Sequence, residues 1–288
     1  MHIGVVFPQT EIEPDAAAIG AYARGVEQLG YRHLLAYDHV LGADPVVHAP
    51  WTRPYDVNTV FQEVFVLFGY LAGITKLHLI TGVLILPQRQ TVLVAKQAAQ
   101  VDVLTGGRLR LGVGIGWNTV EYEALGKTFR DRARREEEQI ELLRRLWTEP
   151  SVSFAGEFDS VTGAGLNPLP VQRPIPIWIG GRSAPAYRRI GRLADGWIPE
   201  MEPGAEFDEA RAHVDEAALR AGRDPSAVGM EARVPWTGDL GRFLDLVEQW
   251  RALGATHLSV NTMRAGLGGV DGHLEVLARL ADELGLQR

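Results

Sequence analysis

Short apolar runs alternate with longer amphipathic runs along the whole chain, and this alternation restricts the possible folds more than any other feature. The apolar runs are nearly continuous, as in residues 79–85 (Leu-Ile-Thr-Gly-Val-Leu-Ile). Such strands are typical of a parallel sheet that is covered on both faces. Eight of them, each followed by a helix, in a chain of 288 residues predict a closed α/β barrel of the (β/α)8 (TIM) type. A doubly wound open sheet is the alternative.

The predicted elements follow from the period of the apolar residues and from cap and turn residues. We expect strands at 3–7, 33–37, 77–86, 108–115, 175–179, 196–199, 227–234 and 256–261. We expect helices at 16–29, 60–71, 91–104, 132–147, 184–193, 206–221, 240–253 and 274–284. Residues 148–170 lie outside the repeat, and the alternation at 151–158 around Ala155-Gly156 predicts a small inserted β-hairpin. No linker-like segment divides the chain, so we expect a single domain over residues 1–288.

Composition excludes several classes of protein. Lys and Arg total 29 against 36 Asp and Glu, and the net charge of −7 argues against a dedicated nucleic-acid-binding protein. The absence of Cys excludes disulfides, thiolate metal sites and a Cys nucleophile. The histidines show no metal-ligand spacing, so we expect no metal. Residues 1–10 lack the pattern of a signal peptide and no apolar stretch is long enough to span a bilayer, which predicts a cytoplasmic protein without membrane contact.

Active sites of such barrels form at the carboxyl ends of the strands, and Asp38 and His39 follow the second predicted strand directly. A carboxylate and an imidazole at this position are suited to proton transfer, because imidazole titrates near neutral pH. The pair is also compatible with an ordinary Asx-type turn beside a solvated histidine.

Two glycine-rich strand ends are further candidate sites. Residues 112–118 (Gly-Val-Gly-Ile-Gly-Trp-Asn) allow a ligand to approach the backbone closely, although the spacing is not the dinucleotide fingerprint. Residues 177–183 (Ile-Trp-Ile-Gly-Gly-Arg-Ser) lead from a strand into a helix N-terminus, which suits an anion. The alternatives are a tight barrel turn for the first segment and a turn with a capping Ser for the second.

Several of these segments together carry a resemblance to a known family. They are residues 37–40 (Tyr-Asp-His-Val), 79–87, 95–108, 111–118 and 176–181. In their order and spacing, the chain resembles the luciferase-like (bacterial luciferase fold) oxidoreductases, and within them the branch that depends on the deazaflavin coenzyme F420. The choice between deazaflavin and flavin rests on fewer of these residues than the family does.

The resemblance implies particular roles. It places Asp38 and His39 at the cofactor ring as catalytic residues, with His39 donating a proton or stabilising a hydride adduct. It implies a bulge with a non-prolyl cis peptide at Gly82 and Val83, which supports the ring. The remaining implied cofactor-binding residues are Gly116, Asn118, Gly180, Gly181, Arg182 and Ser183, the last four at the phosphate. The implied substrate pocket contains His48, Trp51 and Trp117. Where sugar-phosphate dehydrogenases of the family carry a catalytic Glu, this chain has Ile115.

The resemblance therefore implies an oxidoreductase that transfers a hydride between F420 and a small organic substrate. The alternatives are an FMN-dependent monooxygenase of the same fold and a non-catalytic flavin-binding protein. A titrating residue at the barrel mouth favours an enzyme, since a storage protein does not need one. Homodimers are common in the family, so a homodimer is an expectation for this chain as well.

Overall fold

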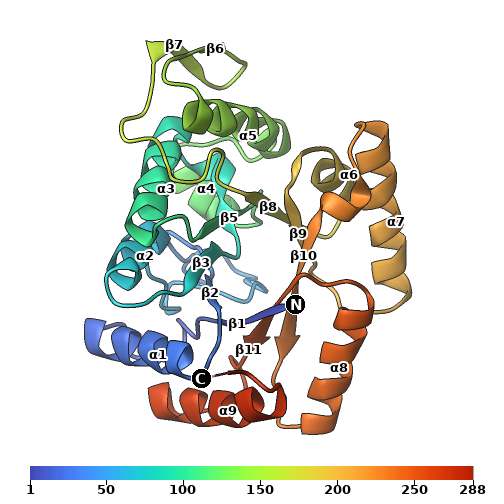
Figure 1. Cartoon of the computed structure of the whole chain (residues 1–288). Helices are drawn as coiled ribbons and strands as arrows, with labels where there is room; N and C mark the ends of the chain where they lie inside the picture. The colour runs from blue at the N-terminus through green and yellow to red at the C-terminus, as the bar shows by residue number, and fades with distance from the viewer. Residues whose placement is uncertain (288) are drawn as a thin grey trace.

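The strands form a closed parallel barrel surrounded by helices (Figure 1). The computed structural model describes residues 1–287. The barrel strands are β1 (His2–Val6), β2 (His33–Ala36), β3 (His78–Thr81), β4 (Leu84–Ile85), β5 (Leu109–Gly114), β8 (Ile177–Gly180), β9 (Gly196–Ile198), β10 (Gly229–Pro235) and β11 (His257–Asn261). Their order is β3-β2-β1-β11-β10-β9-β8-β5-β4, and pairing of β3 with β5 closes the sheet. Because β3 and β4 are two pieces of one barrel strand, the predicted (β/α)8 barrel is confirmed and the open sheet is excluded.

The helices pack around the outside of the barrel and cover its apolar outer surface. They are α1 (Ala16–Gln28), α2 (Val64–Ala72), α3 (Thr91–Thr105), α4 (Thr119–Ala124), α5 (Arg132–Thr148), α6 (Ala184–Leu193), α7 (Ala205–Arg220), α8 (Leu240–Ala252) and α9 (Gly269–Glu283), with short 3₁₀ turns η1 (Leu86–Gln88) and η2 (Pro225–Ala227). The helix α1 shows why they form, since the Asp15 carboxylate accepts a hydrogen bond from the Ala18 amide at 2.8 Å and caps the helix. Its residues Tyr22 and Val26 are fully buried one turn apart.

Three predicted elements had wrong boundaries, and one short helix was missed. The helix α2 begins at Val64 rather than at residue 60, because the Glu63 side chain caps it by accepting from the Val66 amide. The helix α9 begins at Gly269, five positions before the predicted start at residue 274. The inserted hairpin consists of β6 (Val152–Ala155) and β7 (Ser160–Ala164), so its turn lies at 156–159 and not at 155–156. The short helix α4 was not predicted.

The hairpin is a peripheral addition to the barrel. Figure 1 shows β6 and β7 projecting beside α5, away from the ring of strands. Among residues 1–287, no helix has both the length and the apolar character needed to cross a membrane.

Candidate active site

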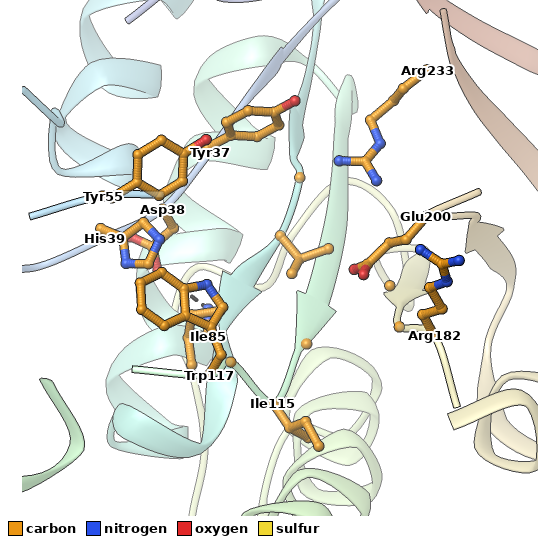
Figure 2. A pocket seen from close by; sticks show the side chains of 16 residues that line it. Tyr37, Asp38, His39, Tyr55, Ile85, Ile115, Trp117, Arg182, Glu200 and Arg233 are labelled. Atoms are coloured by element: carbon orange, nitrogen blue, oxygen red, sulfur yellow. Dashed lines mark hydrogen bonds between the residues drawn. The ribbon is translucent and has the colours of Figure 1, made fainter. Parts of the chain in front are cut away.

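A cavity of about 480 Å³ lies at the carboxyl ends of the barrel strands. Its lining residues are Tyr37, Asp38, His39, Tyr55, Gly82, Val83, Ile85, Gly114, Ile115, Gly116, Trp117, Gly180, Gly181, Arg182, Glu200 and Arg233 (Figure 2). The volume falls within the range of about 300–1,000 Å³ that small-molecule sites usually have. The structure therefore brings together both glycine-rich segments and the Asp38-His39 pair, which are far apart in the sequence.

The carboxylate of Asp38 is engaged by protein groups. One oxygen accepts a hydrogen bond from Arg89 Nη2 at 2.7 Å, and the other accepts from the Ile85 amide at 3.2 Å. Burial raises the pKa of Asp38, while the Arg89 guanidinium and the Ile85 amide act in the opposite direction. Because both oxygens have partners, Asp38 is suited to holding the strand end and the following His39 in place rather than to exchanging protons with a ligand.

His39 is fixed at the cavity wall by a residue that sequence reasoning missed. Its Nδ1 lies 3.2 Å from an oxygen of Glu121, the third residue of α4. The other Glu121 oxygen accepts from the Val40 amide, and from the Leu41 amide at 3.3 Å. Burial alone would raise the pKa of Glu121, but the donors from His39, Val40 and Gln88 outweigh it and lower that pKa. An ionised Glu121 favours the His39 tautomer with a proton on Nδ1, which leaves Nε2 for a ligand.

Aromatic side chains surround the His39 imidazole. Its ring centroid lies 5.3 Å from that of Tyr55, 4.8 Å from Phe61 and 5.4 Å from Trp117. These contacts fix the plane of the imidazole and provide flat apolar surface beside it. One wall of the cavity therefore combines an imidazole with a surface on which a planar molecule can pack.

The floor of the cavity is the interruption between β3 and β4. The Gly82–Val83 peptide bond is cis, as the resemblance predicts. The Val83 side chain lies between two glycines: a Cβ on Gly114 would be 2.6 Å from Val83 Cγ2, and one on Gly180 would be 2.9 Å from Val83 Cγ1. A Cβ on Gly82 would lie 2.2 Å from Leu35 Cδ2 in the barrel core. These glycines leave space for Val83 and keep the floor free of larger side chains.

The predicted phosphate segment is only partly at the cavity. Gly180 and Gly181 line it, whereas the Ser183 hydroxyl caps α6 by accepting from the Ala186 amide at 3.4 Å. Arg182 lines the cavity, but two hydrogen bonds of 2.6 Å join its guanidinium to the Glu206 carboxylate. The backbone of the two glycines and the start of α6 are thus the groups most available to an anion.

Three other predicted site residues lie outside the cavity lining. Asn118 is buried, and its side-chain oxygen caps α4 by accepting from the amides of Val120 at 3.2 Å and Glu121 at 3.4 Å. It therefore supports the site through Glu121. His48 and Trp51 border a neighbouring depression. The ring centroid of Trp51 lies 6.0 Å from that of Trp117, which lines the cavity.

A comparison with known protein families decides the affiliation of the chain. Residues 1–238 match the family described as luciferase-like monooxygenase. The chain belongs to the luciferase-like monooxygenase family. This match extends from β1 through β10, so it includes every strand that contributes a residue to the cavity.

Relatives of this luciferase-like protein differ in their described cofactors. An uncharacterised protein of Mycobacterium tuberculosis is 40% identical over 164 residues, which are 57% of this chain and 56% of that protein. An FMNH₂-dependent dimethylsulfone monooxygenase of Pseudomonas putida is 33% identical over 182 residues, which are 62% of this chain and 49% of that enzyme. The chain thus matches only about half the length of these two relatives.

A solved structure confirms the fold at low sequence identity. The coenzyme F420-dependent tetrahydromethanopterin reductase of Methanopyrus kandleri superposes with a TM-score of 0.77 over 99% of both chains, at 15% identity. At this identity the similarity concerns the barrel alone. The luciferase-like fold is therefore shown, while its neighbours include proteins described with FMNH₂ and with F420.

Sequence reasoning about this luciferase-like site missed Tyr37, Tyr55, Glu121, Glu200 and Arg233. Tyr37 directly follows strand β2 and Glu200 is the second residue after strand β9, which was a usable signal. Asn118 and Glu121 have the spacing of a helix-capping box, but no local pattern places Glu121 against His39.

Proposed function

We propose that this luciferase-like protein is an oxidoreductase that transfers a hydride between coenzyme F420 and a small organic substrate. The observation that carries the proposal is the His39–Glu121 pair beside the Gly82–Val83 floor. A buried carboxylate that orients an imidazole at the edge of a cavity is an arrangement for proton transfer. The presence of this pair also weighs against a purely flavin-storing protein.

The residues of the cavity fit a planar cofactor with a phosphate tail. The glycine-bordered floor at Val83 and the aromatic wall of Tyr55 and Trp117 would hold the ring, and the backbone of Gly180 and Gly181 would face the phosphate. When bound, the deazaflavin supplies or accepts the hydride. His39 would move a proton at Nε2, while Glu121 keeps Nδ1 protonated and Asp38 holds the strand end through Arg89.

The lining also bears on the substrate. Ile115 contributes no carboxylate to the cavity, so the residues argue against the sugar-phosphate oxidation of some family members. Trp117 presents a flat face to a substrate packed over the ring. We extend the proposal to a cytoplasmic protein that forms a homodimer.

An FMN-dependent monooxygenase is the second candidate function. The Pseudomonas putida relative, described as FMNH₂-dependent, favours it. Phosphate groups occur in both cofactors, so the glycine segment and α6 fit either one. The two functions differ in what happens with oxygen, because only the monooxygenase consumes it.

The position of the phosphate is tested by replacing Ser183 with Asp. Asp is also a good helix cap, so α6 should persist while a negative charge is placed beside the anion. We expect the dissociation constant of the cofactor to rise about ten-fold at low salt, and the effect to shrink as added salt screens the charge. Isothermal titration calorimetry with F420 and FMN measures this. Ser183→Asn, which caps without a charge, is the matched control, and equal affinities of the two variants at low salt would place the phosphate elsewhere.

A further inference from the structure

Arg233 projects from the barrel interior into the cavity. On β10, Ala232 and Val234 are fully buried against the outer helices, so Glu231, Arg233 and Pro235 face inward. Glu231 lies deep in the barrel, where it pairs with Arg110 at 2.7 Å. Arg233 is two residues nearer the carboxyl end and lines the cavity. Its position is therefore set by a barrel strand and not by a loop.

The guanidinium of Arg233 has few partners. Its Nη2 donates to the Pro199 carbonyl oxygen at 3.2 Å, and its Nε is buried without a hydrogen-bond partner. Within residues 1–287, no carboxylate forms an ion pair with it. A guanidinium offers five N–H donors, and a partly buried cation without a counter-ion is unfavourable. Burial closes off Nε, so the N–H groups that remain for a ligand are those of Nη1 and the second N–H of Nη2.

The other arginines of the site are paired. Arg182 is joined to Glu206 at 2.6 Å, and Arg89 is joined to Asp38 at 2.7 Å. Figure 2 shows Arg233, Glu200 and Arg182 on the side of the cavity opposite His39 and Trp117. Arg233 is therefore the cation of the lining whose charge protein carboxylates do not satisfy.

The space beside Arg233 continues beyond the main cavity. A second depression, of about 520 Å³, shares Tyr37, Arg182, Glu200 and Arg233 with it and extends past Met201. A ligand in the cavity can therefore have a polar end at Arg233 and still reach open solvent. The Tyr37 backbone on this route is fixed by two hydrogen bonds of 2.9 Å with the buried Gln9 side chain.

We propose that Arg233 binds a carboxylate group of the substrate, so that the substrates of this enzyme are small organic carboxylates. Planar carboxylates match the fork of N–H donors on a guanidinium, which binds them through two parallel hydrogen bonds. The apolar part of such a molecule would pack against Tyr37 and over the cofactor ring that covers Val83. Glu200 lies on the same wall, and its negative charge opposes the carboxylate and limits its affinity. This inference rests on the proposed function for the assignment of the cavity as the substrate site.

The test compares carboxylates with neutral amides of the same shape. Benzoate and benzamide, phenylacetate and phenylacetamide, and hexanoate and hexanamide are titrated into the protein without cofactor, by ligand-observed NMR at low salt. We expect at least one carboxylate to bind about ten-fold more tightly than its amide. Arg233→Gln should abolish the preference, Arg182→Gln should keep it because that guanidinium is paired with Glu206, and Glu200→Gln should increase it.

Three outcomes would overturn the proposal. They are no preference in any of the three pairs, a preference that persists in Arg233→Gln, and a loss of F420 or FMN affinity in Arg233→Gln together with the loss of the preference, which would assign the guanidinium to the cofactor. Failure of the proposed function gives a different result, because the wild-type protein would then bind FMN in preference to F420, or neither cofactor, whatever the carboxylate titrations show.

Discussion

Replacing His39 with Asn is expected to lower turnover by about 10²–10⁴-fold, the usual contribution of general acid–base catalysis. Asn cannot exchange a proton, which accounts for the loss of turnover. Because Asn retains a polar side chain, cofactor affinity should change by less than about three-fold. Turnover is followed as F420 oxidation with a substrate that the wild-type protein accepts in a screen, and F420 binding is titrated in parallel. The two readouts separate a catalytic residue from a binding residue.

The matched control is His213→Asn on α7, since His213 lines no part of the cavity. This variant should keep the wild-type rate and affinity. If His39→Asn also keeps its rate, His39 only packs against Phe61 and Trp117, and the proton comes from another group. If it loses cofactor affinity in proportion to its rate, His39 is a binding residue.

Replacing Glu231 with Gln is expected to destabilise the fold strongly. The carboxylate is fully buried within the barrel, where it lies 2.7 Å from Arg110 Nη2, 2.8 Å from His33 Nε2 and 2.6 Å from Ser259 Oγ. The amide would leave the buried Arg110 guanidinium without a counter-charge, which costs about 3–5 kcal/mol. For a domain of 288 residues, with an unfolding entropy of about 2.1 cal/mol/K per residue, the midpoint of thermal unfolding should fall by roughly 5–8 °C.

Differential scanning calorimetry at neutral pH measures this shift. Ser259→Ala is the control, because it removes only the hydroxyl contacts with Glu231 and His33 from the same cluster, leaves the charge of Glu231 in place, and should cost about 1–2 kcal/mol. A shift for Glu231→Gln no larger than that of Ser259→Ala would show that the charge of Arg110 is satisfied by other means. The Arg110 guanidinium also stacks on Trp178, with Cζ 4.5 Å from the ring centroid, and this contact would then be the first candidate for stabilising the charge.

The fold could be predicted from the sequence because each strand appears there as a short run of apolar residues. A strand buried on both faces must be apolar throughout, and the regular alternation with helices gives the barrel. Errors are concentrated at helix starts, where a single side chain decides the boundary. The helix α4 has only six residues, and its cap Asn118 was interpreted as a cofactor contact. Six residues are too few to show the 3.6-residue period by which a helix is predicted.

The candidate site could be predicted only where its residues stand at the ends of strands. Asp38, His39 and the glycines at the ends of β5 and β8 are of this kind, and they all line the cavity; these glycines are Gly114, Gly116, Gly180 and Gly181. The pairing of His39 with Glu121 joins residues 82 positions apart, and no local pattern contains it. Arg233 could be predicted only weakly. It is the second charged residue, two positions after Glu231, in an otherwise apolar strand. The inward direction of both residues emerges only when the barrel closes.

Direct titration of the protein with F420 and with FMN, each in its reduced form and under controlled oxygen, tests the proposed hydride transfer most directly. We expect reduced F420 to bind with a dissociation constant at least about ten-fold below that of reduced FMN, a difference of about 1.4 kcal/mol. We also expect the complex with F420 to consume no oxygen. Preferential binding of reduced FMN, accompanied by oxygen consumption, would contradict the F420-dependent function and establish the monooxygenase.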